Sequence, residues 1–175
     1  MARHLLHLYT GDGKGKTTAA MGLALRMLGH GRTVLIAQFM KDGTSGELRA
    51  LRQFGRVTLF EGARMEGFVF RMTEPELEEA REQQSRAVSE LSEKVRSLRP
   101  DLTVLDELAV ALATRMVGRA DAERLLDAAL ESGDAVVTGR GAPDWLRERA
   151  DYVSDVAAVK HPFEEGQAAR EGIEW

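Results

Sequence analysis

The chain has 175 residues, of which 43% are hydrophobic and 30% charged, and a formal net charge of −4 at pH 7. This length suits one buried core, so we expect a single domain over residues 1–175, and the negative charge argues against nucleic acid as a partner. The absence of cysteine excludes disulfides and cysteine-bound metals. Without an apolar run long enough for a membrane span or a stretch that fits a signal peptide, we expect a cytoplasmic protein with no membrane partner.

The first third of the chain alternates short apolar runs with helical patterns. Residues 33–39 form a continuous apolar run, which is typical of a strand buried on both faces of a parallel sheet. His4 and His7 alternate along the first strand, and we expect them at an edge or on the surface. The expected elements are strands at 5–9, 33–39 and 57–60 and helices at 17–28 and 47–54.

The rest of the chain continues the same alternation. Thr73 and Glu76 form a capping-box pattern that predicts the start of a helix running to about Leu98. A loop rich in glycine and phenylalanine precedes it. Further expected elements are strands at 101–105, 135–138 and 152–159 and helices at 108–114, 121–131 and 143–150. Strands that alternate with helices predict an α/β fold with a mainly parallel central sheet.

A glycine-rich segment at residues 10–18 follows the first strand and opens the first helix, which is the setting of a phosphate-binding P-loop. Its backbone N–H groups and the helix N-terminus favour bound phosphate, Lys16 suits the outer phosphates, and the Thr17 hydroxyl suits Mg²⁺. Thr10 stands where the first glycine of such loops belongs, so we expect phosphates to be held differently from an ordinary NTPase. The expected ATP-binding residues are Thr10, Gly11, Asp12, Gly13, Lys14, Gly15, Lys16, Thr17 and Thr18.

Two acids, Asp106 and Glu107, end the strand at 101–105. In P-loop proteins such a strand lies beside the phosphate loop and its acid meets Mg²⁺, whereas the alternative is a pair of ordinary helix-capping acids. Either acid can be the ligand, and we favour Glu107. Lys41 and Arg140 also follow strands, where each could reach ATP or remain an ordinary surface residue.

Several separate motifs together resemble the P-loop ATP:corrinoid adenosyltransferases, which act on cob(I)alamin and cob(I)yrinic acid a,c-diamide. The resemblance covers nearly the whole chain and includes the displaced glycine of the phosphate loop. It implies a three-layer, RecA-like P-loop fold and a homodimer. The motifs are residues 9–20, 29–31, 38–41, 105–108, 138–141, 159–163 and 172–175.

The resemblance also implies an unusual chemistry, in which Co(I) of the corrinoid attacks the 5′ carbon of ATP and the whole triphosphate leaves. Lys16, Thr17 and Glu107 would then be catalytic, with Mg²⁺ (or Mn²⁺) on Thr17 and one of the two acids. Phe68 and Phe70 match an aromatic pair that packs on the corrinoid and keeps cobalt four-coordinate, which eases reduction by an electron-donating flavoprotein reductase. Ordinary core burial is the alternative for these two side chains.

Two other functions suit a P-loop alone. A small-molecule kinase needs an acceptor site with a base and a lid arginine, and the sequence offers no convincing lid. An ATPase switch would use Glu107 to polarise water and would release free phosphate. The displaced glycine, the aromatic pair and the tail motif favour the adenosyltransferase.

Overall fold

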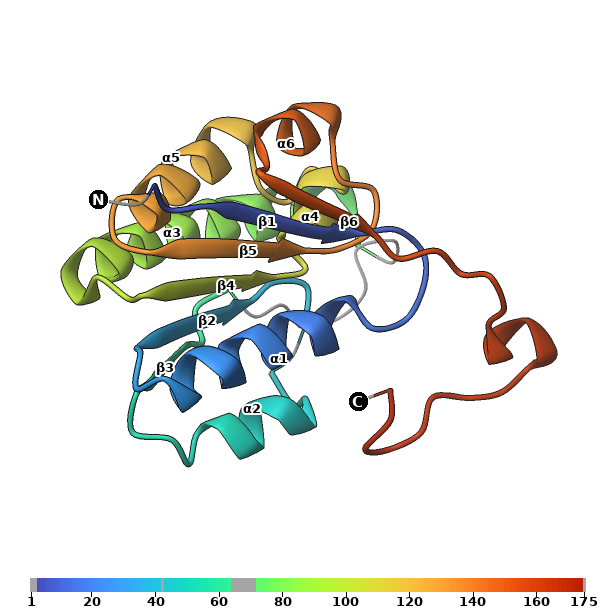
Figure 1. Cartoon of the computed structure of the whole chain (residues 1–175). Coiled ribbons are helices and arrows are strands. Elements are labelled where there is room, and N and C mark those ends of the chain that lie inside the picture. The colour runs from blue at the N-terminus through green and yellow to red at the C-terminus, as the bar shows by residue number, and fades with distance from the viewer. Residues whose placement is uncertain (1–2, 42, 64–71, 175) are drawn as a thin grey trace.

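The computed structural model describes residues 3–41, 43–63 and 72–174 and is built on one six-stranded sheet (Figure 1). The strand order is β3-β2-β4-β5-β1-β6, and every neighbouring pair is parallel. The sheet predicted as mainly parallel is therefore parallel throughout. Its strands are β1 (Leu6–Thr10), β2 (Val34–Gln38), β3 (Val57–Phe60), β4 (Leu102–Asp106), β5 (Asp134–Thr138) and β6 (Tyr152–Asp155).

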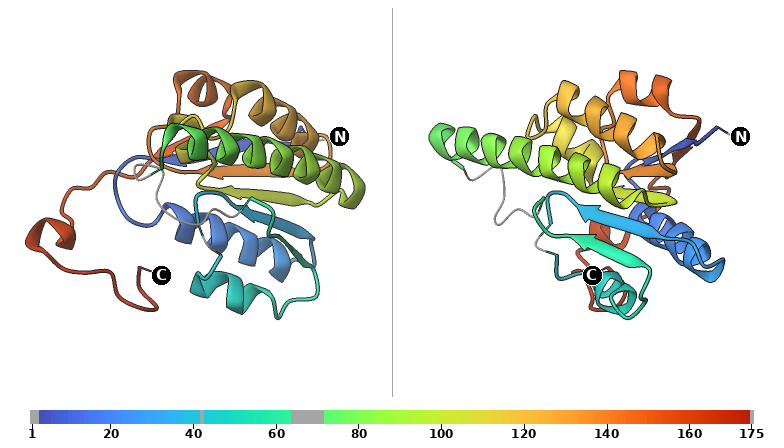
Figure 2. Two further views of the ribbon diagram at one scale, coloured as in Figure 1. Left: turned by 180° about the vertical axis from the view of Figure 1, so that it is seen from behind. Right: turned by 90° about the vertical axis from the view of Figure 1, so that its left-hand side faces the viewer.

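Helices cover both faces of this sheet, as Figure 1 and the two further views in Figure 2 show. The predicted three-layer α/β arrangement is confirmed. No helix among the described residues is long and apolar enough to cross a membrane. One face carries α1 (Lys16–Gly29) and α2 (Gly46–Leu51), and the other carries α3 (Glu74–Leu98), α4 (Leu108–Ala113), α5 (Arg119–Leu130) and α6 (Asp144–Arg149).

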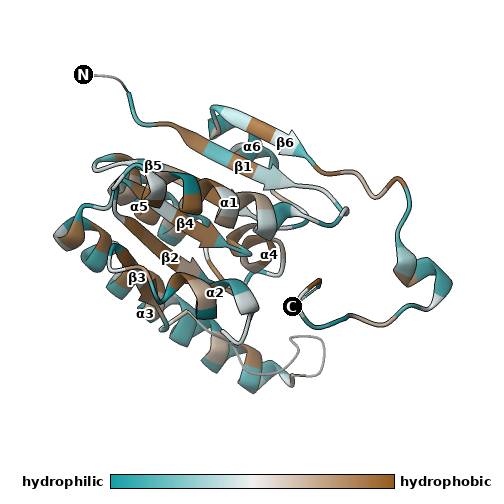
Figure 3. Cartoon of the chain, turned by 60° about the horizontal axis from the view of Figure 1, so that its bottom comes forward, coloured by the Kyte–Doolittle hydropathy of each residue, from teal (hydrophilic) through white to brown (hydrophobic). Residues whose placement is uncertain are grey.

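The core is divided by the sheet into two apolar layers, because successive strand residues point to opposite faces. On β2, Leu35 and Ala37 join the layer under α3 to α6, whereas Val34 and Ile36 join the layer under α1 and α2. Figure 3 shows the central strands β2 and β4 largely in the colours of hydrophobic residues. The continuous apolar run predicted for a buried parallel strand is thus confirmed for β2.

The last strand is shorter than the sequence predicts, because β6 ends at Asp155 instead of Val159. Beyond Asp155 the backbone bonds the phosphate loop instead of continuing a strand. The N–H of Val156 donates to the carbonyl of Thr10, and the Val156 carbonyl accepts from the N–H of Gly13 at 2.7 Å. The remaining chain extends away from the sheet, forms the short 3₁₀ helix η2 (Pro162–Glu165), and turns back (Figure 1).

The sequence predicts His7 at an edge or on the surface. The edge position is wrong, because β1 lies between β5 and β6, but the side chain is partly exposed. The His7 ring is partly buried and stacks on Tyr152 of the neighbouring edge strand, with 4.6 Å between ring centroids. Burial lowers the pKa of His7, while the nearby carboxylates of Asp134 and Asp151 oppose that shift. His4 is exposed, as expected.

Candidate functional site

The carboxyl ends of the parallel strands meet at one edge of the sheet, and the chain segments that follow them form the candidate site. After β1 the chain crosses one face of the sheet as α1, which contacts β4 and β5. It then enters β2, on the other side of β4. Ligands of open parallel sheets bind where neighbouring strand connections diverge in this way. The fold therefore brings the ends of β1, β2, β4 and β5 to a single location.

The phosphate loop wraps through glycines and leaves the start of α1 open. Gly15 is the N-cap of α1 with φ of 114°, and no side chain caps the helix there, so its first N–H groups are available to an anion. Lys16 is buried and folds back so that its Nζ donates to the Gly13 carbonyl at 2.6 Å. Burial and then the Arg140 charge lower the pKa of Lys16.

The displaced glycine has a structural reason in the segment that follows β6. A Cβ on Gly11 would stand 2.4 Å from Asp155 Oδ1 and 2.6 Å from the Val156 carbonyl, and one on Gly13 would stand 2.6 Å from the Ala157 carbonyl. Gly11 also has φ of 94°. Glycine is therefore needed at 11 and 13 because another backbone segment lies against the loop.

Thr10 is placed differently from the exposed part of the loop. Its side chain is fully buried, and its hydroxyl has no hydrogen-bond partner among the described residues. It lies at the end of β1, and its carbonyl accepts the Val156 N–H.

A buried carboxylate, Asp106, lies at the centre of the site. Its side chain is 0% exposed, and its two oxygens accept four hydrogen bonds, two each. A buried charge held in this way has its desolvation offset by its partners. The donors are Thr17 Oγ1 at 2.8 Å, Gln38 Nε2 at 2.9 Å, Lys41 Nζ at 2.7 Å and Thr138 Oγ1 at 2.6 Å.

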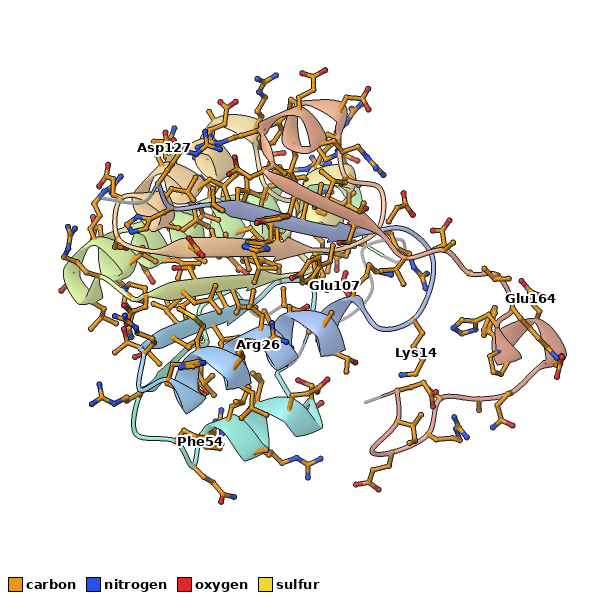
Figure 4. The ribbon with its side chains drawn as sticks, viewed as in Figure 1. Lys14, Arg26, Phe54, Glu107, Asp127 and Glu164 are labelled. Carbon is orange, nitrogen blue, oxygen red and sulfur yellow. The ribbon has the colours of Figure 1, made fainter. Side chains whose placement is uncertain are left out.

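The backbone conformation of Glu107 gives its side chain a different environment from that of Asp106. It is the N-cap of α4 with φ of 62°, and its N–H donates to Thr138 Oγ1 at 2.9 Å. Its side chain is 23% exposed, and its Oε1 atom lies 3.9 Å from Lys41 Nζ. Burial raises the pKa of Glu107, opposed by the charges of Lys41, Lys16 and Arg140. Figure 4 shows Glu107 at the sheet edge that carries the phosphate loop.

The structure thus brings most of the predicted polar residues together, with some differences. Asp106, rather than the favoured Glu107, makes the direct contact with Thr17. Lys14 is exposed and points toward the tail, where its Nζ donates to the Ile173 carbonyl (Figure 4). Asp12 and Thr18 are exposed on the loop and the first turn of α1. Phe68 and Phe70 lie outside the described residues.

Two polar residues of the site, Gln38 and Thr138, were not singled out as functional by the sequence analysis. Both are buried, and both donate to Asp106. Each is the last residue of its strand, β2 or β5. A polar residue that directly follows a buried apolar run at the end of a strand is the sequence signal that could have identified them.

The donor set fits Mg²⁺ bound together with a triphosphate. Among the described residues no group of three histidine, aspartate or glutamate side chains could form a metal site alone. Thr17, Asp106 and Glu107 offer one hydroxyl and two carboxylates. Mg²⁺ is commonly bound through one or two carboxylates with the remaining positions taken by phosphate oxygens and water.

A surface hollow elsewhere on the molecule lacks comparable chemistry. It has a volume of about 630 Å³ and no carboxylate in its lining. Thr33 and Arg56 precede β2 and β3, so the hollow lies at the amino ends of the strands, away from the phosphate loop. Its lining residues are Leu28, Thr33, Phe54, Gly55 and Arg56.

Comparison with solved structures supports this P-loop fold. The KaiC-like protein PH0186 from Pyrococcus horikoshii OT3 superposes with a TM-score of 0.53 over 90% of this chain and 74% of that chain. The two sequences are 15% identical, so the likeness concerns the fold alone.

Comparison with families and curated relatives is more specific. A family model described as ATP:corrinoid adenosyltransferase BtuR/CobO/CobP matches residues 2–175. A corrinoid adenosyltransferase of Pseudomonas aeruginosa is 36% identical, covering 99% of this chain and 84% of that protein. Those of Escherichia coli strain K12 and Salmonella typhimurium strain LT2 are 35% and 34% identical, each covering 99% of this chain and 86% of the relative. Because the family model matches residues 2–175 and the relatives match 99% of this chain, the chain belongs to the ATP:corrinoid adenosyltransferase family.

Proposed function

We propose that this chain transfers the 5′-deoxyadenosyl group of ATP to Co(I) of a corrinoid and releases triphosphate. The family match over residues 2–175 carries the proposal. The geometry supports it, because the open N-terminus of α1 and the Lys16 ammonium suit the phosphates, and the acidic end of β4 suits their cation.

Once Co(I) is present, the transfer needs no reactant other than ATP. The electron pair of Co(I) forms a bond to the 5′ carbon, the bond between that carbon and its phosphate oxygen breaks, and triphosphate leaves with the bonding pair. Cobalt is thereby oxidised formally to Co(III). Because Co(I) is itself a strong nucleophile, the step needs no general base. A buried Asp106 whose two oxygens already accept hydrogen bonds suits such a site.

The residues of this chain would act mainly on the leaving group. The N–H groups at the start of α1 and the Lys16 ammonium stabilise the charge that develops on the triphosphate oxygens. Arg140, whose charge acts on Lys16, adds a further cation from the end of β5. Thr17 and the Asp106–Glu107 pair would hold Mg²⁺ (or Mn²⁺), which supplies Lewis-acid stabilisation of the same oxygens.

Other parts of the proposal derive from the resemblance. Phe68 and Phe70 would contact the corrinoid, and a flavoprotein reductase would supply the electron that generates Co(I). A homodimer and a cytoplasmic location complete the proposal, together with ATP and the corrinoid as the two substrates.

An anaerobic assay tests the function directly. Protein, Mg²⁺, ATP and chemically reduced cobalamin are incubated while the visible spectrum and the phosphate products are followed. We expect a light-sensitive alkylcobalamin spectrum with stoichiometric triphosphate. ADP or free phosphate with an unchanged corrinoid spectrum would contradict the proposal and indicate a kinase or an ATPase.

One variant tests the phosphate-clamp role within that assay. Lys16→Ala should lower kcat by roughly a hundredfold or more, as the loss of one preorganised donor to developing charge does in other enzymes. Lys94→Ala removes the same charge from an exposed position on α3 and serves as the control. Normal turnover by the Lys16 variant would contradict the clamp.

A further inference from the structure

The acidic end of β4 is already occupied by a cation of the chain itself. Lys41 Nζ donates to Asp106 Oδ2 at 2.7 Å and to Thr17 Oγ1 at 3.1 Å, and lies 3.9 Å from Glu107 Oε1. These three oxygens belong to the same side chains that fit Mg²⁺. An ammonium at hydrogen-bond distance from both Thr17 and Asp106 leaves no room for a metal ion bound to the same atoms.

Electrostatics explains why a cation is needed there. Asp106 is fully buried, and three of its four donors are uncharged. Lys41 therefore supplies the one full positive charge that contacts this carboxylate among the described residues. Without it, a buried negative charge would depend on neutral donors alone, which is costly in a low-dielectric interior.

The position of Lys41 also allows its ammonium to leave. Its side chain is 28% exposed, and its backbone lies just beyond β2 between Met40, with φ of 54°, and Gly43, with φ of 78°. A lysine head on a flexible four-carbon stem can move to solvent without opening the apolar core. Asp106 keeps its bonds from Gln38 and Thr138, which hold the carboxylate in place.

We infer that Lys41 is a resident cation, which fills the divalent-cation position in the nucleotide-free protein and is displaced when Mg²⁺ arrives with the nucleotide. Divalent cations alone then bind poorly, because they must expel an ammonium without the help of phosphate oxygens. The nucleotide shifts this competition by adding its own negative charge. The inference rests on the proposed function only for the identity of the nucleotide.

The test measures Mn²⁺ binding in the absence of ATP and corrinoid, by electron paramagnetic resonance of free Mn²⁺. We expect weak binding by the wild-type chain and an apparent Kd roughly tenfold lower or more in Lys41→Ala, because a competing charge is removed. Lys41→Gln, which keeps a hydrogen-bond donor for Asp106 but no charge, should behave in the same way and carries the test if Lys41→Ala does not fold. Lys94→Ala is the control for net charge and should bind Mn²⁺ as the wild type does.

A double variant tests whether the Mn²⁺ gained by the Lys41 variants binds at Asp106. Adding Asp106→Asn to Lys41→Gln should abolish the gain, which would link it to the oxygens that Lys41 contacts. Equal Mn²⁺ affinity in the wild type and both folded Lys41 variants would overturn the inference. So would tight binding to the nucleotide-free wild type. Because neither substrate is present, these results are separate from the adenosyl-transfer assay, and either proposal can fail alone.

Discussion

At the scale of single residues, the site depends on one carboxylate that links four chain segments. Asp106 receives hydrogen bonds from the start of α1, from the end of β2 and the segment after it, and from the end of β5. These segments are far apart in the sequence and meet only in the folded chain. Asp106 therefore has a structural role besides the one proposed for it in cation binding, since its hydrogen-bond donors are left without acceptors if it changes.

Replacing this carboxylate should destabilise the protein. In Asp106→Asn the charge is lost and one acceptor oxygen becomes a donor, so buried donors such as Gln38 and Thr138 compete for the remaining oxygen. We expect the free energy of unfolding to fall by about 3 kcal/mol, as for buried polar groups left unsatisfied. Urea unfolding followed by circular dichroism measures the loss.

The neighbouring acid provides a matched comparison. Glu107→Gln changes a side chain that is partly exposed and for which Lys41, at 3.9 Å, is the ion-pair partner among the described residues. Its unfolding free energy should change by less than about 1 kcal/mol. Equal losses in the two variants would mean that the hydrogen bonds of Asp106 do not hold the site together.

How far the sequence predicts the site depends on whether a residue acts locally. The loop at 10–18 and the strand-end acids could be predicted, because a glycine-rich turn between strand and helix has its own local pattern. The reason for glycine at 11 and 13 could not, since it lies in close approaches to the Asp155 side chain and to the backbone of residues 156–157. The contact of Lys41 with Asp106 could not be predicted either, because it depends on the pairing of β2 with β4, and the sequence does not show which strands are neighbours.

At the scale of elements, β1 is the strand whose neighbours in the sheet are hardest to predict from the sequence. Its residues pair with β5 on one side and β6 on the other, both drawn from the last third of the chain. Apolar periodicity predicts that β1 is a strand but does not give its place in the sheet order. The wrong expectation of an edge strand at His7 and the early end of β6 both follow from this missing information.

The position of β1 gives its histidine a measurable effect on stability. Burial lowers the pKa of His7 in the folded chain, so the unfolded chain binds more protons as the pH falls below about 6.5. The stabilisation from the neutral ring is therefore present above that pH and is lost as the pH falls through the lower, folded-state pKa. The urea midpoint should decline across this interval.

Substitution isolates the effect of that ring. His7→Gln should flatten the decline of the urea midpoint between about pH 7.5 and about pH 5. His30→Gln, in the exposed turn that follows α1, is the control for replacing a histidine elsewhere in the chain. An unchanged slope in the His7 variant would show that other groups govern acid sensitivity in this range.

At the scale of the whole molecule, the sheet with its two helical layers is distinct from the tail. The side chains of Val159 and Phe163 are 94% and 78% exposed, so the tail adds little to either apolar core. Figure 1 shows it extending beyond the sheet edge that carries the phosphate loop and turning back. The alternation of strands and helices predicted the layers, whereas the course of the tail has no periodic signal in the sequence.

Truncation separates these two parts. A chain that ends at Ala158 keeps β6 and the contacts of Val156 with the loop, so its free energy of unfolding should change by less than about 0.5 kcal/mol. A chain that ends at Asp151 loses β6 and exposes β1, and should be clearly destabilised. Urea unfolding compares the two. A large loss in the longer of these two truncated chains would show that the tail contributes to the core fold.

The strand order also has a consequence for how the protein is made. The phosphate loop lies near the start of the chain, but β1 has its partners at residues 134–138 and 152–155, and the loop itself is bonded by Val156. During synthesis, β1 and the phosphate loop therefore lack these partners until residues 134–156 have left the ribosome. The loop therefore reaches its folded form only after residues 134–156 have joined the sheet, and nucleotide cannot assist folding before then.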